Sequence, residues 1–340
     1  MKVVFGFSVL LAASCLIGRA DASAWGVNLY VPEGSADSYL SDWVFKLAAD
    51  MGVTYIVLWQ TNFNEHVRSV SKAQLVDAVH RMKAFGLKPI VDLEYDVDEA
   101  VALVSALGSD CMMYEVGKEP HVAGTDASAS VSEYVSYWNQ IVTACRKVNP
   151  DAWYGGPVVG SPTTSPSNSP PYLKAYLQQC DGDFLSVHSF PGGSTRSEAI
   201  SRARTRTVSD MQQLKALMAE YGKELPILFT EVQWTSAVTS NGWDVDKEFN
   251  DAWTTSLMTA MQEQNVSAAC FWVLMGYDNN FAILKPPSKN YTCKPQYYSI
   301  QNYIAEHVPE NFNLPIFLIA MTFALATILT VGKKRKVIDV

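Results

Sequence analysis

Eight short apolar runs alternate with eight longer amphipathic stretches, and this alternation limits the possible folds more than any other feature of the sequence. Apolar runs of this kind are typical of strands in a parallel sheet that helices cover on both faces. The predicted strands are Trp25–Tyr30, Tyr55–Trp59, Lys88–Leu93, Met112–Val116, Trp153–Val158, Phe184–His188, Pro226–Thr230 and Ala268–Val273. The predicted helices are Tyr39–Met51, Lys72–Phe85, Asp98–Leu107, Val131–Val148, Tyr172–Gln179, Arg196–Tyr221, Val245–Gln264 and Gln296–Glu306.

Eight complete strand–helix units predict a closed (β/α)8 barrel, the TIM-barrel fold of class α/β, as a single domain over residues 25–308. An open doubly wound sheet is the alternative, but no glycine-rich phosphate loop follows the first strand. Two predicted helices begin with capping boxes, Ser130 with Glu133 and Thr195 with Glu198. Glycines that allow a left-handed exit end three others, at Gly52, Gly86 and Gly222.

The two ends of the chain predict export and a membrane anchor. Residues 1–24 carry an early lysine, an apolar middle and the small residues Ala22, Ser23 and Ala24, as a secretory signal peptide does. Residues 314–331 contain no charge and are long enough for one transmembrane helix. The basic tail at 332–340 is then cytoplasmic, residues 309–313 form a linker, and the barrel lies outside the cell at its surface.

Composition excludes several classes of function. The net charge of −8 makes nucleic acid an improbable partner. Removal of the signal leaves an odd, scattered set of five cysteines, which predicts at most one or two disulfides. No cysteine or histidine spacing predicts a metal site, and no cofactor is expected.

Two carboxylates stand where strands end in such a barrel. Glu119 follows the fourth predicted strand and Glu231 comes at the end of the seventh. All strands deliver their carboxyl ends to one mouth, so these two side chains can meet across it. Hydrolysis of a glycosidic bond needs one protonated and one ionised carboxyl, about 5–5.5 Å apart in retaining enzymes. The sequence therefore predicts a glycoside hydrolase that acts on an oligosaccharide or polysaccharide.

The motifs around these residues resemble those of the clan A (β/α)8 retaining glycoside hydrolases. In that clan the acid/base lies in a Tyr/Phe-Glu-x-x-Asn-Glu-Pro motif, and here residues 114–120 read Tyr-Glu-Val-Gly-Lys-Glu-Pro. The nucleophile motif resembles Thr230 to Trp234. The resemblance implies that Glu119 is the acid/base and Glu231 the nucleophile. It further implies that Trp272 floors the sugar subsite and that His188 lies in the site.

Two departures from the clan's motifs stand at the predicted site. The clan's asparagine, which binds the sugar 2-hydroxyl, is replaced by Lys118, whose charge favours ionisation of a neighbouring carboxyl. The tyrosine two positions after the site histidine is Phe190, so a hydroxyl partner for the nucleophile must come from elsewhere, such as Tyr277.

Further substrate contacts are expected from aromatic and acidic residues. Exposed aromatic rings stack on the faces of sugars, which makes Trp59, Trp234 and Trp272 candidates, although each could also be a core residue. Trp243, in a polar run, is harder to place in a core. Glu94 follows the third strand at the same mouth, where a structural role and a substrate contact are both open.

Two functions remain in competition. The first is a membrane-tethered retaining glycosidase. The second is an inactive barrel that binds glycans, which Lys118 and Phe190 favour. The arrangement of Lys118, Glu119 and Glu231 distinguishes them, because a lysine that bridges the two carboxylates supports the binder.

Overall fold

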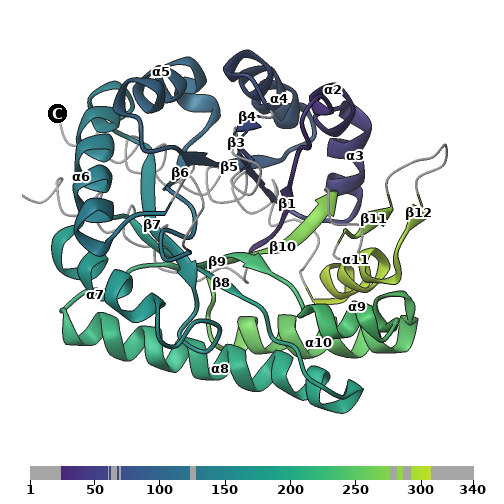
Figure 1. Ribbon diagram of the computed structural model, residues 1–340. Helices are drawn as coiled ribbons and strands as arrows, with labels where there is room; N and C mark the ends of the chain where they lie inside the picture. Colours follow the sequence, from purple (N-terminus) through teal and green to yellow (C-terminus); the bar gives the residue numbers. More distant parts are fainter. Residues whose placement is uncertain are drawn as a thin grey trace, which may run out of the picture.

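The computed structural model describes residues 24–59, 61–62, 67–68, 70–122, 128–275, 282–285 and 292–307. Eight parallel strands close into a barrel in the order β1-β10-β9-β8-β7-β6-β5-β2, which confirms the predicted (β/α)8 architecture. These strands lie at the centre of Figure 1, with the helices around them. They are β1 (Ala24–Leu29), β2 (Tyr55–Leu58), β5 (Lys88–Leu93), β6 (Met113–Val116), β7 (Trp153–Gly160), β8 (Phe184–Ser189), β9 (Ile227–Val232) and β10 (Ala268–Met275).

The outer ring consists of helices that follow the strands. Its members are α2 (Ala36–Tyr39), α3 (Asp42–Asp50), α4 (Lys72–Ala84), α5 (Val97–Leu107), α6 (Val131–Val148), α7 (Ser169–Gln179), α8 (Arg196–Glu220), α9 (Ser236–Ser240), α10 (Lys247–Glu263) and α11 (Pro295–His307). Two 3-10 turns, η1 (Gly108–Asp110) and η2 (Trp243–Val245), and two short hairpins complete the described elements. The hairpins pair β3 (Thr61–Asn62) with β4 (Val67–Arg68), and β11 (Leu284–Lys285) with β12 (Thr292–Cys293).

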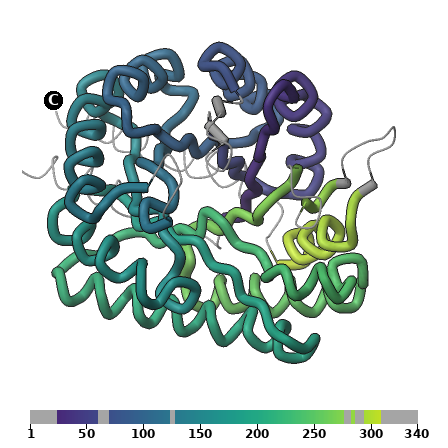
Figure 2. The backbone as a smooth tube through the Cα atoms, in the orientation of Figure 1, coloured from purple at the N-terminus to yellow at the C-terminus, as the bar shows by residue number. Residues whose placement is uncertain are grey.

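The ring is closed by segments from opposite ends of the barrel sequence. Figure 2 shows α11, in yellow, beside the purple α3. The Tyr297 hydroxyl donates to the Leu47 carbonyl at 3.1 Å, and the Gln301 amide donates to the Asp50 carbonyl at 2.7 Å. One hydrophobic core lies between strands and helices, and a smaller one is formed mainly by strand residues such as Val57, Ile90 and Leu228.

The helix boundaries correct two predictions. The helix predicted at Tyr39–Met51 begins later, as α3 at Asp42, because its N-cap Ser41 adopts an extended backbone (ψ 155°). Tyr39 is the last residue of the separate short helix α2. Ser130 and Glu133 form the predicted capping box. Thr195 accepts from the Glu198 N–H, but the Glu198 carboxylate accepts from the Ser194 N–H at 2.7 Å, so the reciprocal half of that box is absent.

The predicted signal peptide, residues 1–24, lies outside the described residues except for Ala24, which is the first residue of β1. The predicted transmembrane helix, residues 314–331, lies wholly outside them. Within the described part of the chain, no helix has both the length and the apolar character needed to cross a bilayer. The five cysteines at 111, 145, 180, 270 and 293 are all free thiols.

Candidate active site

The loop after β6 carries Lys118 and Glu119 in an unusual backbone conformation. Gly117 has φ +72°, and a Cβ there would collide with the ring of Tyr95. Glu119 itself is left-handed at φ +47°, and its N–H donates to the carbonyl of Val158 at 2.8 Å. Val158 is also left-handed, at φ +55°, which is rare for a β-branched residue. Backbone strain of this kind is concentrated at functional sites, and here it fixes the direction of Glu119.

His188 joins the two predicted catalytic carboxylates. It stands on β8 in register with Glu231 on the neighbouring strand β9. Its Nδ1 atom lies 3.0 Å from Glu119 Oε1 and 3.5 Å from Glu231 Oε2. These two oxygen atoms are therefore no further apart than the sum of the distances, about 6.5 Å, where the range of inverting enzymes begins. The barrel thus brings residues 119, 188 and 231 together as predicted.

Lys118 is also drawn into this group. Its Nζ atom lies 2.5 Å from Glu231 Oε1, and both side chains are more than nine-tenths buried. The ammonium also lies 2.7 Å from the centroid of the Trp59 ring and 4.6 Å from that of Trp272. The Lys118 ammonium thus forms a buried ion pair with Glu231, the predicted nucleophile.

The charges around Glu119 and His188 shift the pKa values of these two groups in opposite directions. Burial raises the pKa of the Glu119 carboxyl, but the hydrogen bond to His188 and the charges of His188 and Lys118 outweigh it and lower the pKa to about 2. Burial lowers the pKa of His188, but the charge of Glu231 and the bond to Glu119 outweigh it and raise this pKa above the ordinary value. The proton shared by this pair therefore resides on the imidazole of His188 and not on the carboxyl of Glu119.

A second pair of acids lies next to the site. Asp92 on β5 and Glu115 on β6 are register partners, and both side chains are buried. Burial, reinforced by the charge of Glu115, raises the pKa of Asp92 well above its usual range. Burial also raises the pKa of Glu115. We conclude that the pair shares one proton, which Asp92 holds.

Two tryptophans form an aromatic wall beside the carboxylates. The rings of Trp59 and Trp272 stack at 4.9 Å with an angle of 22°. Tyr30 packs edge-on against both, at 5.9 Å in each case. Tyr30 was not predicted as a site residue, although its position as the last residue of the first predicted strand was the available signal. Trp59 is only 6% exposed and lies between Lys118 and Trp272, so the half-buried Trp272 is the ring suited to hold the apolar face of a sugar.

The outcomes of the other three predicted contacts, Trp234, Glu94 and Tyr277, differ. Trp234 is 1% exposed and packs against Phe249 and Trp253, which is the core role left open by the sequence. Glu94 is half-buried after β5. Tyr277 lies outside the described residues.

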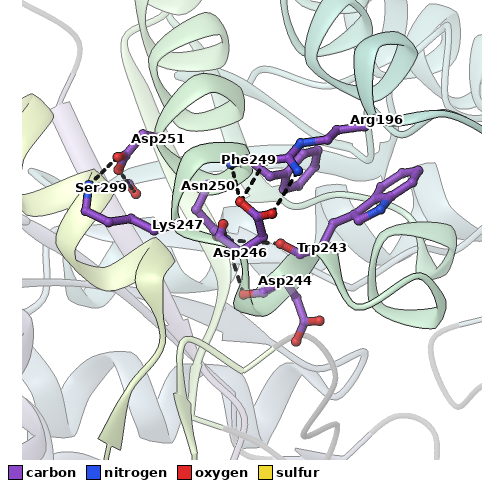
Figure 3. Close-up of polar contacts among 9 residues, drawn as sticks. All are labelled: Arg196, Trp243, Asp244, Asp246, Lys247, Phe249, Asn250, Asp251 and Ser299. Atoms are coloured by element: carbon purple, nitrogen blue, oxygen red, sulfur yellow. Dashed lines mark hydrogen bonds and ion pairs between the residues drawn. The ribbon is translucent and has the colours of Figure 1, made fainter.

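Trp243 belongs to a structural junction between α8 and α10. Its ring packs on Phe249 at 5.7 Å, and its carbonyl accepts from the Asn250 amide at 3.2 Å (Figure 3). Asp246 caps α10 and accepts two hydrogen bonds from Arg196, at 2.6 and 2.7 Å. The polar run around Trp243 thus anchors a helix.

Two amides that the sequence did not single out support the site from the neighbouring strands. Gln233 donates to the carbonyl of Trp272 at 2.5 Å. Asn28 on β1 donates to the carbonyl of Thr230, the residue before Glu231, at 2.8 Å. An amide side chain in an otherwise apolar strand was the only signal for Asn28.

Within the described part of the chain, no cluster of three or more histidine, cysteine, aspartate or glutamate side chains is arranged to hold a metal ion. The described site therefore consists of carboxylates, one histidine, one lysine and an aromatic wall.

Comparison with solved structures identifies glycosidases with the same fold. The glucosidase from Croceicoccus marinus aligns with a TM-score of 0.57 and 16% identity, over 83% of this chain and 66% of that protein. The α-L-arabinofuranosidase from Thermotoga maritima aligns with a TM-score of 0.61 and 12% identity, over 82% of this chain and 69% of that protein. The family 39 β-xylosidase from Caulobacter crescentus aligns with a TM-score of 0.58 and 14% identity, over 84% of this chain and 71% of that protein. The chain thus spans about two thirds of the length of these proteins.

A comparison with curated protein sequences gives no match. Residues 103–282, more than half of the chain, match the family described as Glycosyl hydrolases family 39. This segment includes Glu119, His188, Glu231 and Trp272. The chain therefore belongs to glycosyl hydrolase family 39, and this membership supports the predicted O-glycosyl hydrolase activity.

Proposed function

We propose that this protein is an extracellular, membrane-tethered glycoside hydrolase that cleaves O-glycosidic bonds with retention of anomeric configuration. The observation that carries the proposal is the placement of Glu119 and Glu231 around one histidine nitrogen, with a stacked tryptophan pair beside them. The upper limit of about 6.5 Å between their nearest oxygens includes the retaining range of 5–5.5 Å and leaves no room for most of the inverting range. The apolar run at 314–331 supports the tether.

In this proposal Glu231 attacks the anomeric carbon while the leaving oxygen takes a proton from the Glu119–His188 pair. The C–O bond to the leaving group breaks, and an ester bond to Glu231 forms. Glu119 then accepts a proton from water, whose oxygen attacks the anomeric carbon and releases Glu231. His188 stores the proton between turnovers, because its pKa is raised while that of Glu119 is about 2.

The charge balance of the site suits a positively charged transition state. With one proton shared by Asp92 and Glu115, the site holds three anionic carboxylates. Lys118 and a protonated His188 supply two positive charges, so one negative charge remains in excess. An excess negative charge stabilises the cationic sugar that develops when the glycosidic bond breaks.

A panel of aryl glycosides and neutral polysaccharides tests the activity. We expect the wild-type chain to release sugar from at least one of them, and Glu231→Gln to lose activity by a factor of about 10⁴ or more, since an amide forms no glycosyl ester. Glu220→Gln, an exposed carboxylate at the end of α8, is the matched control and should keep wild-type rates. Equal rates in the wild type and Glu231→Gln would contradict the proposal.

The second candidate function is glycan binding without cleavage, and the Lys118–Glu231 ion pair favours it. An ammonium beside the nucleophile competes with the anomeric carbon for the same oxygen. The second function is the correct one if the wild-type chain binds polysaccharide but never releases product, and if Glu231→Gln binds it with the same affinity.

A further inference from the structure

A cavity opens at the end of the barrel opposite the active site. It is formed where four barrel strands begin, at Tyr55 of β2, Lys88 of β5, Met113 of β6 and Trp153 of β7. Tyr55 pairs with Lys88 and Met113 with Trp153, so these first residues stand side by side along the barrel rim. The cavity has a volume of about 570 Å³, which lies in the range of small-molecule binding sites.

The lining of this cavity exposes large apolar side chains. Trp153 is 46% exposed and Met112 is 36% exposed, although each belongs to or adjoins a strand whose later residues are buried. Tyr55 adds a second, half-buried aromatic ring to the same cavity. The exposed indole of Trp153 contributes little to the packing of the barrel, whereas exposed aromatic rings in concave sites are typical of ligand binding.

Charges of both signs surround these apolar groups. Lys83 forms an ion pair with Asp110, and the Lys88 ammonium lies 6.0 Å from the centroid of the Tyr55 ring. Asp151 is exposed two residues before Trp153. The two acids disfavour an anionic ligand and the two lysines disfavour a cationic one. The cavity therefore fits a neutral molecule that has an apolar face and both donors and acceptors along its edges.

We propose that this cavity is a second saccharide-binding site, which takes one or two units of a neutral glycan with a sugar face stacked on Trp153. The C–H face of a pyranose supplies the apolar contact, and its hydroxyls donate to Asp151 and accept from Lys88. The site lies on the face away from Glu119 and Glu231, so it holds polysaccharide without taking part in bond cleavage. The proposal is independent of whether the opposite mouth hydrolyses glycans.

The test measures binding of neutral hexasaccharides of β-1,4-linked mannose, β-1,4-linked xylose and β-1,3-linked glucose to the full chain by calorimetry. Glu231→Gln serves as the background, so that no ligand is consumed. We expect Trp153→Ala to raise the Kd of one class of binding site by about tenfold or more. Asp151→Ala, at an exposed turn position, should weaken the same class without affecting the strand. The matched control Tyr298→Ala removes another exposed aromatic ring, 49% exposed on α11, and should leave binding unchanged.

In the otherwise wild-type chain, Trp153→Ala should retain hydrolysis of small aryl glycosides, because these reach only the active site. Identical binding isotherms for the Trp153→Ala, Asp151→Ala and Tyr298→Ala variants would overturn the proposal. It would also fail if a peptide of residues 3–17 competed for the cavity while the saccharides did not. That result would assign the cavity to the segment before β1, since Gly26 of β1 pairs with Tyr55.

Discussion

In the proposed mechanism, His188 controls where the catalytic proton resides. It donates to Glu119, whose pKa is about 2, while its own pKa is raised above the ordinary value of about 6.5. The proton is present on the pair at low pH and is lost as the pH rises through the raised pKa of His188. We therefore expect a plot of kcat/KM against pH to have an alkaline limb, with its midpoint above about pH 6.5.

His188→Gln should move this alkaline limb to lower pH. Without the imidazolium, the proton must be held by Glu119 itself, whose pKa rises when the hydrogen bond to His188 is lost but is still lowered by the charge of Lys118. pH–rate profiles of both proteins measure the shift. His80→Gln is the control, because His80 lies on α4 and pairs with Asp110 and not with Glu119 or Glu231. An alkaline limb that stays in place in His188→Gln would exclude His188 as the proton store.

In the proposed mechanism, Lys118 restrains Glu231 through their ion pair. Two substitutions separate the effect of the charge of Lys118 from that of its bulk. Lys118→Met keeps the length of the side chain against Trp59 and removes the ammonium. Lys118→Asn removes the charge, frees space and supplies a neutral N–H group. We expect Lys118→Asn to raise kcat/KM by about tenfold, a gain of about 1.4 kcal/mol in transition-state stabilisation. A gain in both variants assigns the restraint to charge, and a gain in Lys118→Asn alone assigns it to bulk.

Loss of activity in a folded Lys118→Asn protein would contradict this account, because it would make the lysine a required substrate contact. The free energy of unfolding should be measured alongside the rates. Removing one partner of a buried ion pair leaves the other charge uncompensated, and His188 compensates Glu231 only in part, at 3.5 Å.

At the scale of elements, the loop after β6 positions the site through Gly117. Gly117→Ala would place a methyl group against Tyr95 and displace the loop that carries Lys118 and Glu119. Gly86→Ala is a matched control, since Gly86 has nearly the same φ, +73° against +72°, and open space around it. Both variants incur a left-handed backbone cost of about 1–2 kcal/mol. We expect only Gly117→Ala to lose more stability than this backbone cost, as measured by urea unfolding. We also expect it alone to lose activity, as measured by its hydrolysis rate. Equal effects would show that Tyr95 yields without moving the loop.

Strand order and most element boundaries could be predicted from the sequence, because the apolar runs and capping residues are local signals. β5 and α6 have the predicted bounds. β7 continues past the prediction to Gly160, since its register shifts between Pro157 and Val159 and the strand remains paired with β8 beyond that point.

The proximity of Glu119 and Glu231 was predictable for the same reason that the barrel was, since the carboxyl ends of all strands meet at one mouth. Other contacts depend on side chains that reach between strands. The ion pair of Lys118 with Glu231 and the hydrogen bond from Gln233 to Trp272 join residues that are distant in the sequence. The core position of Trp234 likewise follows from its packing on helix α10, which no local pattern specifies.

At the scale of the whole molecule, the barrel is complete before the predicted membrane segment. The last described helix, α11, closes the ring through contacts with α3. We therefore expect deletion of residues 314–340 to release a folded, soluble protein that retains glycosidase activity. Fractionation of cells that express the full and shortened chains tests this, with the full chain expected in membranes. A shortened chain found only as aggregate would show that the deleted segment is part of the core.

The measurement that tests the central claim most directly is covalent trapping of the glycosyl enzyme. A 2-deoxy-2-fluoro glycoside with a good leaving group slows hydrolysis of the intermediate more than its formation, so a retaining enzyme accumulates the ester. Peptide mapping by mass spectrometry should find the sugar on Glu231, in the peptide around β9, and no label in Glu231→Gln. A sugar on another carboxylate, or steady product release with inverted configuration and no label, would contradict the assignment of Glu231 as the nucleophile.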